Sequence, residues 1–156
     1  MSDAIIRVAC GADAGALATL RSTWTAGLPE DPDFETRMAA WLASEGERRT
    51  TWLAILDDRP VGMASLFEYR RMPRPGRLDS RWGYVSNMFV LEGFRNRGIG
   101  SALLTAVVST ADERGYARLV LSPSRQALAF YREAGFIVPD ERAHDDRLLV
   151  RPTRQG

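Results

Sequence analysis

Residues 87–101 have the sequence NMFVLEGFRNRGIGS, and this stretch decides the fold. The apolar run at 88–90 is typical of a strand, and apolar spacing from Gly100 onward predicts an amphipathic helix. Between them, Gly98 removes a side chain where the backbone must bend and where a ligand must approach closely. The first amides of a helix point outward and, together with the helix dipole, suit an anion such as a pyrophosphate. The stretch therefore predicts a strand, a turn and a helix that form an anion site.

Other glycine loops fit this stretch poorly. A P-loop requires a lysine, and all 21 basic residues of this chain are arginine. A dinucleotide fingerprint requires a third glycine, but Leu103 stands at that position. Arg95 and Arg97 instead add positive charge at the rim of the turn.

Composition limits the class of protein. The chain has 156 residues, of which 45% are hydrophobic and 26% charged, as in a globular protein, and we expect a single domain over 1–156. A net charge of +1 gives no electrostatic reason to expect nucleic-acid binding. One cysteine, Cys10, and one histidine, His144, exclude an internal disulfide and argue against a metal centre. No run approaches a membrane span, and the N-terminus does not resemble a signal peptide, so we expect a cytoplasmic protein.

The rest of the chain predicts a mixed order of elements. Short apolar runs predict strands at 5–8, 51–56, 61–69, 82–91, 118–122, 136–138 and 147–151. Helical spacing predicts helices from a cap at Asp13 to Trp24, from Phe34 to a terminator at Gly46, at 100–114, and at 124–134 with Gly135 as a left-handed cap. Residues 57–60, 70–77 and 140–146 are expected to be turns or loops. The order β-α-α-β-β-β-α-β-α-β-β predicts an α+β fold with a central, partly parallel sheet.

Two motifs carry a resemblance to a known family. Arg95-x-x-Gly98-x-Gly100, preceded by a strand ending in Val90, is similar to motif A of the GNAT superfamily of acyl-CoA N-acyltransferases. Residues 127–136, ALAFYREAGF, look like the family's segment on the following helix. The resemblance covers nearly the whole chain. It implies the acyl-CoA N-acyltransferase fold, with a mixed sheet splayed between the fourth and fifth strands and acetyl-CoA in the opening.

The resemblance assigns residues to acetyl-CoA. Backbone groups of the strand would pair with the pantetheine arm, and the amides of the turn would hold the pyrophosphate. The implied cofactor-binding residues are Met88, Phe89, Val90, Arg95, Asn96, Arg97, Gly98, Ile99, Gly100, Ser101 and Ser124. Ser124 stands where the family often has asparagine, and its hydroxyl has a shorter reach. No metal is implied.

Tyr131 matches the family's usual general acid. A substrate amine attacks the thioester carbonyl, and the leaving thiolate then needs a proton or a hydrogen bond. A phenol with a pKa near 10 can supply one. The alternative is that Tyr131 is a core aromatic residue on helical spacing.

The general base remains open in the sequence. Many family members have a glutamate near the splay, but residues 84–87 contain no carboxylate. Ser86 or Asn87 could hold a water chain, or Glu68 on the preceding strand could relay the proton. His144 lies in a charged stretch, where a solvated histidine is the more common outcome.

The sequence gives its weakest indication for the site that binds the acceptor amine. Five large side chains could line it or belong to the core: Trp24, Trp41, Tyr69, Met72 and Trp82. Five arginines of one loop could attract an anionic group or be solvated: Arg70, Arg71, Arg74, Arg77 and Arg81. The sequence predicts an N-acetyltransferase that uses acetyl-CoA and a small amine, or a protein N-terminus. The alternative is a degenerate module that senses acyl-CoA. A homodimer is compatible with either function.

Overall fold

The computed structural model describes residues 3–25, 27–76, 80–137 and 149–152. The chain divides into two compact units. The first contains Met1–Ser65 and Asn87–Val107, and the second contains Leu66–Ser86 and Val108–Gly156. Three elements run from one unit into the other: β3 (Arg59–Arg70), β4 (Arg81–Val90) and α3 (Ile99–Glu113).

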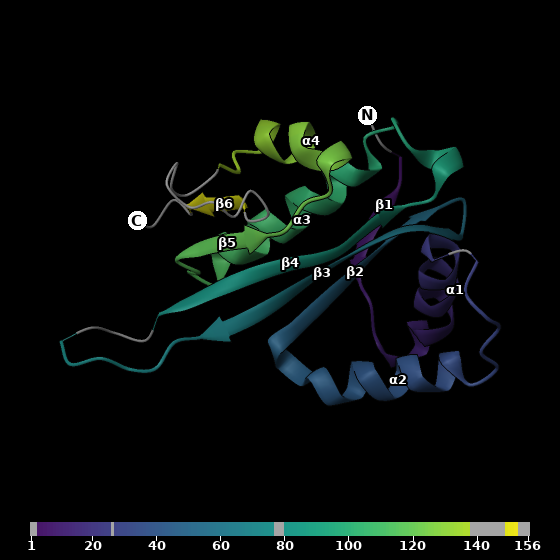
Figure 1. The fold of residues 1–156 in the computed structure, drawn as a ribbon, viewed down its shortest axis with the longest axis horizontal. Helices are drawn as coiled ribbons and strands as arrows, with labels where there is room; N and C mark the ends of the chain where they lie inside the picture. Colours follow the sequence, from purple (N-terminus) through teal and green to yellow (C-terminus); the bar gives the residue numbers. More distant parts are fainter. Residues whose placement is uncertain (1–2, 26, 77–79, 138–148, 153–156) are drawn as a thin grey trace. The chain divides into compact units, whose positions relative to one another are not determined.

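Six strands form one sheet in the order β1-β2-β3-β4-β5-β6 (Figure 1). The remaining strands are β1 (Ile5–Val8), β2 (Arg49–Leu56), β5 (Arg118–Leu121) and β6 (Leu149–Pro152). The pairs β1–β2 and β5–β6 are antiparallel, whereas β4 and β5 are parallel. The described parallel register joins Gly83 to Leu119 and Tyr84 to Val120, so it uses only the first part of β4. The predicted α+β fold with a mixed sheet is confirmed.

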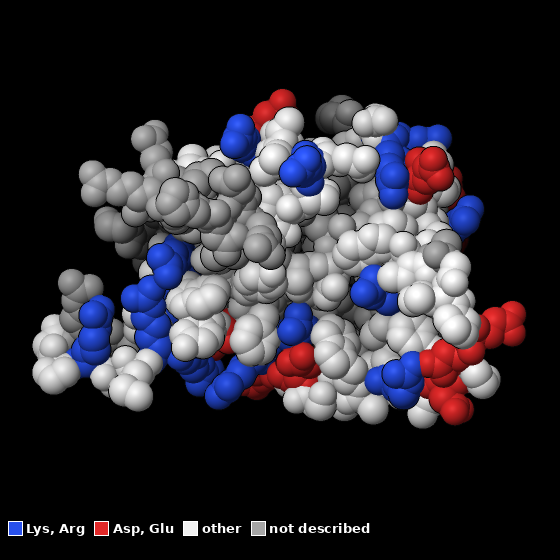
Figure 2. Space-filling model, viewed as in Figure 1, with Lys and Arg blue, Asp and Glu red and all other residues white. Residues whose placement is uncertain are grey.

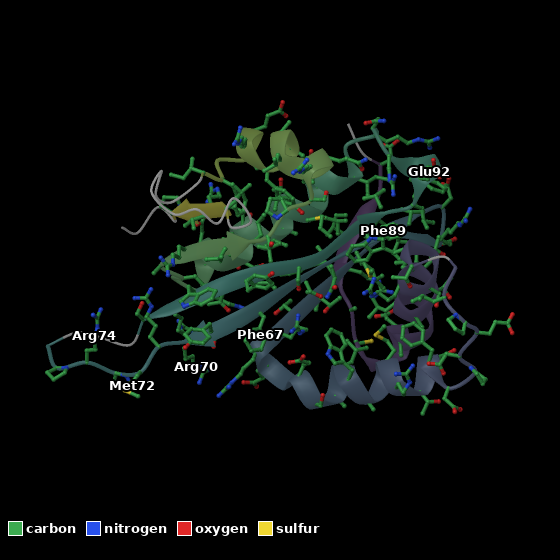
Figure 3. All side chains as sticks on the ribbon, viewed as in Figure 1. Phe67, Arg70, Met72, Arg74, Phe89 and Glu92 are labelled. Atoms are coloured by element: carbon green, nitrogen blue, oxygen red, sulfur yellow. The ribbon has the colours of Figure 1, made fainter. Side chains whose placement is uncertain are left out.

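The first unit has its own apolar core. Helices α1 (Ala14–Trp24) and α2 (Phe34–Glu45) pack against each other, as Figure 1 shows. Leu17 and Leu20 of α1 form a buried cluster with residues of three strands, namely Leu53, Met63 and Phe89. Figure 3 labels Phe89 on β4. This cluster holds the second half of β4 in the first unit.

In the second unit, large side chains pack closely around a glycine of β4. Leu66, Tyr116 and Leu119 are fully buried there, and each has an atom within 3.0 Å of where a Cβ on Gly83 would lie. The β3 and β5 side chains therefore fill the space that a side chain at Gly83 would need. The short helix α4 (Leu128–Glu133) also belongs to this unit.

The β2–β3 hairpin is tighter than the sequence predicted. Strand β2 begins at Arg49 rather than at residue 51, and β3 begins at Arg59, so the turn contains only Asp57 and Asp58. Both aspartates have positive φ angles, 49° and 60°. Two successive left-handed residues give the turn that matches the twist of paired strands, and Asp tolerates that conformation better than most residues.

Asp13 does not cap α1 with its side chain, contrary to the prediction. Its carboxylate instead accepts hydrogen bonds from the Arg7 guanidinium at 2.8 and 2.9 Å and from the Cys10 amide at 2.8 Å. The hydrogen bond from Arg7 is the main cause that holds the Asp13 pKa well below its usual range. The residue thus joins β1 to the start of α1.

The last third of the chain differs from the sequence-based prediction in two details. The predicted helix at 124–134 begins with a 3-10 turn, Arg125–Ala127, before α4, and Gly135 follows it with a φ of 94° as predicted. The predicted strand at 136–138 is reduced, in the described part, to one antiparallel bridge between Ile137 and Val150. Residue 138 and the predicted turn at 140–146 lie outside the described residues.

We predict that Gly83→Ala destabilises the protein by about 1–3 kcal/mol, because a new methyl group would overpack a filled core. Gly93→Ala is the matched control, since a Cβ at Gly93 meets no atom within 4 Å. Urea denaturation should show a lower unfolding free energy for the first variant only. Equal stability of both variants would contradict the packing described around β4.

Candidate functional site

The turn between β4 and α3 has the backbone that the sequence predicted. A 3-10 turn, Glu92–Phe94, is followed by Asn96 and Gly98 with φ angles of 61° and 79°, and α3 begins at Ile99. The amide of Ala102 makes a helical bond to the Gly98 carbonyl at 3.0 Å, so the amides of 99–101 precede it. Ile99 is buried, whereas Gly98 and Ser101 are exposed. A core side chain therefore anchors the helix while its first amides face solvent.

Two arginines flank this turn. The Arg95 Nε donates to the Val90 carbonyl at 3.0 Å, and its guanidinium lies 5.9 Å from the Phe89 ring centroid. The Arg97 guanidinium lies 5.4 Å from the ring of Phe94. Neither guanidinium forms an ion pair within the described part of the chain. Both charges are available to an anion.

The strand before the turn contains the predicted residues 88–90. Phe89 is buried in the core, and Met88 and Val90 are half-buried. A Cβ on Gly62 would lie 3.1 Å from the Phe89 carbonyl oxygen, so β3 runs close to β4 at this point. Asn87 has a φ of 53° within the strand. This left-handed conformation is uncommon for residues other than glycine, although Asn adopts it more readily than most.

The second unit contains the other two predicted site residues. Tyr131 is 7% exposed on α4, and its ring meets those of Phe130 and Phe136 edge-on at 5.1 and 5.7 Å. Burial raises the pKa of Tyr131 to about 12. Its hydroxyl makes no hydrogen bond to any described residue. Ser124 is exposed and precedes the 3-10 turn, and its hydroxyl does not cap that turn.

A cavity of about 380 Å³ lies within the first unit. Its lining residues come from α1, α2, β2, β3 and β4: Leu17, Arg21, Phe34, Arg37, Met38, Trp41, Thr51, Met63, Ser65 and Asn87. The hydroxyls of Thr51 and Ser65 are buried and lie 3.0 Å apart. The cavity has the size and the mainly apolar lining of a small-molecule site.

Of the large side chains predicted near an acceptor, Trp41 lines this cavity. Trp24 stacks on Phe89 in the same unit, with ring centroids 5.3 Å apart. Tyr69 and Trp82 belong to the second unit and stack on each other at 4.7 Å, and Met72 is 86% exposed.

The sequence reasoning missed both arginines of the cavity. Arg21 stands four residues after Leu17, and Arg37 stands three residues after Phe34, so each lies on the apolar stripe of its helix. A charged residue on the apolar stripe of a helix is the sequence signal that could have located this cavity.

The Glu68 side chain is buried, and its carboxylate has hydrogen-bond partners within the protein. It accepts hydrogen bonds from Arg70 at 2.7 Å, from Tyr116 at 2.9 Å and from Arg81 at 3.2 Å. Burial alone would raise the pKa of Glu68, but the hydrogen bonds from Arg70 and Tyr116 and the charge of Arg81 outweigh it and lower the pKa. A carboxylate stabilised in this way is a poor proton acceptor, which does not favour Glu68 as general base.

The arginine-rich loop divides into bound and exposed residues. Arg70 and Arg81 bind Glu68, whereas Arg71 and Arg74 are exposed. Figure 2 shows basic side chains gathered where the β3–β4 loop lies, and Figure 3 shows Arg70, Met72 and Arg74 along that loop. Arg77 lies outside the described residues, as does His144.

Neither a metal site nor a membrane helix is found in the described residues. No group of three or more His, Cys, Asp or Glu side chains is placed there to bind a metal ion. None of the described helices has the length and apolar character needed to cross a membrane.

Comparison with known proteins identifies the family. Residues 16–136 match the model of the acetyltransferase (GNAT) family, so the chain belongs to this family. A glucosamine 6-phosphate N-acetyltransferase from Trypanosoma brucei brucei is 30% identical over 92 residues, which are 59% of this chain and 57% of that protein. The matched region thus spans little more than half of this relative.

Solved structures share the fold. A predicted acetyltransferase from Clostridium acetobutylicum, solved with acetyl-CoA, has a TM-score of 0.72 at 22% identity, covering 88% of this chain and 92% of its own. An acetyltransferase from Trypanosoma brucei has a TM-score of 0.73 at 23% identity, with coverages of 90% and 96%. The glucosamine-6-phosphate N-acetyltransferase from Arabidopsis thaliana has a TM-score of 0.73 at 15% identity, with coverages of 89% and 95%.

We predict that Glu68→Gln lowers the unfolding free energy at pH 7 by about 2 kcal/mol, because it removes a carboxylate that holds charged hydrogen bonds. Since the folded pKa of Glu68 is lowered, this stabilisation is present above the ordinary value of 4.5 and is lost as the pH falls through the folded pKa. The difference in Tm between wild type and variant should therefore shrink below about pH 4.5. Glu133→Gln, at an exposed position of the same unit, should change Tm little at any pH. A pH-independent difference for Glu68→Gln would contradict this account.

Proposed function

We propose that this protein is a cytoplasmic enzyme that transfers an acetyl group from acetyl-CoA to a primary amine of a small molecule, with the 156 residues forming one acetyltransferase domain. The β4–α3 turn carries the proposal. It combines two left-handed residues, the first amides of a 15-residue helix and two arginines that form no ion pair with a described residue. That arrangement suits the pyrophosphate of a CoA ester. Family membership and a structural relative solved with acetyl-CoA support it.

The strand and the turn would bind different parts of acetyl-CoA. The amides of 96–101 would hold the pyrophosphate, with Arg95 and Arg97 at the rim. Backbone groups of 88–90 would pair with the pantetheine arm as an added strand does. The Val90 carbonyl accepts from Arg95 and keeps a second lone pair, so it can still accept from the arm.

The proposed chemistry is direct attack. The amine nitrogen forms a bond to the thioester carbonyl carbon, the carbon–sulfur bond breaks, and the electron pair leaves on the CoA sulfur. The nitrogen that becomes positively charged on attack gives its proton to water, because no carboxylate is among the described residues that line the cavity. We assign the hydrogen bond to the leaving sulfur to Tyr131, whose hydroxyl has no described partner and stays protonated across the biological pH range.

We place the acceptor in the cavity of the first unit. Its volume suits a small molecule better than a folded protein, and the hydroxyls of Thr51 and Ser65 offer polar partners at a mainly apolar wall. The relative from Trypanosoma brucei brucei is named for an amino sugar phosphate, which is also a small amine. This supports a small-molecule acceptor over a protein N-terminus.

We predict that Ser101→Glu abolishes the rise in Tm that acetyl-CoA causes in the wild type. A carboxylate in the first turn of α3 suits the helix dipole, so the fold should be kept, but it repels the pyrophosphate. Ser109→Glu is the matched control, because it lies two turns further along the helix, about 12 Å away and thus beyond a Debye length of about 10 Å at 0.1 M salt. Thermal shifts with and without acetyl-CoA test this. If Ser101→Glu keeps the wild-type shift, the turn does not bind the pyrophosphate.

We predict that Tyr131→Phe lowers kcat by about 100-fold while the affinity for acetyl-CoA stays unchanged, because the leaving thiolate loses its hydrogen-bond donor. With a pKa of about 12, the phenol should cause no loss of rate up to about pH 11 in the wild type. Tyr116→Phe is the control, since that hydroxyl binds Glu68 and should affect stability rather than kcat. Thiol release over a panel of amines measures both. An unchanged kcat for Tyr131→Phe would assign this residue to packing alone.

The same assay separates the enzyme from a sensor of acyl-CoA. Acetyl-CoA binding without thiol release from any amine would favour the sensor. Thiol release that depends on both the amine and Tyr131 would favour the enzyme.

A further inference from the structure

The charges of the cavity in the first unit restrict the acceptor, and this inference rests on the proposed function. Two guanidinium groups, those of Arg21 and Arg37, line the cavity, and none of the described lining residues is acidic. The other walls are apolar or neutral. A cationic pocket of this kind attracts an anion and disfavours an acceptor that carries several positive charges.

Arg21 is held in place without a carboxylate partner. It is half-buried, and no ion pair joins it to a described residue. Its guanidinium lies 4.7 Å from the ring centroid of Trp24, and that ring stacks on Phe89 with an angle of 10° between the planes. This stack orients the guanidinium, whose donor fork fits a carboxylate or a phosphate.

Arg37 is the second guanidinium of the lining, and it is less available to a ligand than Arg21. It forms an ion pair with Asp31 and lies 5.5 Å from the ring of Phe34. The Arg37 side chain is 65% exposed, so the ion pair is screened by solvent and can exchange for a ligand anion. Figure 2 shows acidic and basic side chains interspersed in the region of α2. Arg21 is therefore the principal anion-binding residue.

The remaining lining residues indicate what kind of ligand body fits the cavity. Phe34, Met38, Trp41 and Met63 offer apolar and aromatic surface. Thr51 and Ser65 add a buried pair of hydroxyls that can accept a hydrogen bond from an amine. We propose that the acceptor is a primary amine with an apolar, preferably aromatic, body and an anionic group that binds Arg21.

Two matched pairs of probes test this proposal. Phenylalanine is compared with phenylalaninamide, and 4-(aminomethyl)benzoate with 4-(aminomethyl)benzamide, so that each pair exchanges a carboxylate for a neutral amide of similar shape. Binding is measured by calorimetric titration in the presence of CoA, and turnover by thiol release from acetyl-CoA. We expect at least one carboxylate to have a Kd and a KM at least tenfold lower than those of its amide.

The variant Arg21→Gln should remove that difference by raising the Kd of the carboxylate about tenfold, while the Kd of the amide stays the same. Arg48→Gln, at an exposed position outside the cavity lining, is the control and should leave both values unchanged. The proposal is overturned if neither carboxylate is preferred, or if the preference survives Arg21→Gln.

A third pair, glucosamine 6-phosphate and glucosamine, tests the apolar body. If the sugar phosphate binds more tightly than both aromatic carboxylates, the apolar part of the proposal is wrong. Failure of the proposed function looks different: acetyl-CoA would not bind and no probe would release thiol, whereas the Arg21-dependent preference would still be measured by titration.

Discussion

The arrangement of the molecule depends on the burial of β4 and of the residue that starts α3. Phe89 is buried in the core of the first unit, Ile99 is almost completely buried, and the residues between them form the exposed turn. Two apolar anchors thus fix both ends of a short segment whose amides must face outward. Because the segment is held from both sides, residues 95–98 can be exposed without loss of order. An anion site of this kind costs little reorganisation when a ligand binds.

The arginines have two different roles. Some complete the structure: Arg7 binds Asp13 between β1 and α1, and Arg70 and Arg81 bind the buried Glu68. Others have no carboxylate partner in the described part of the chain, among them Arg21, Arg95 and Arg97. The near-zero net charge of the chain conceals this difference. Burial and partners, rather than the number of arginines, indicate which of them are available to a ligand.

The sequence could predict the parts that depend on local pattern. Glycines and apolar spacing located the turn at Gly98 and the helix after it, and the change of apolar period along the chain gave the order of helices and strands. Side-chain partnerships could not be predicted. Asp13 looked like a helix cap, but its carboxylate binds Arg7, six residues earlier on β1, and the geometry of that local contact cannot be read from residue types. The cavity was missed for the same reason, since Arg21 and Arg37 face it only once α1 and α2 pack together.

The high pKa of Tyr131 has a consequence for the fate of the proton. A cysteine thiol ordinarily has a pKa near 8.5, and the value of about 12 for this phenol lies above the range of thiols. Full proton transfer from Tyr131 to the sulfur would therefore be strongly unfavourable. In the reaction proposed for this protein, the CoA sulfur would leave as an anion held by a hydrogen bond and take its proton from solvent. The enzyme would then never contain a tyrosinate, and no step would be needed to return a proton to Tyr131 between turnovers.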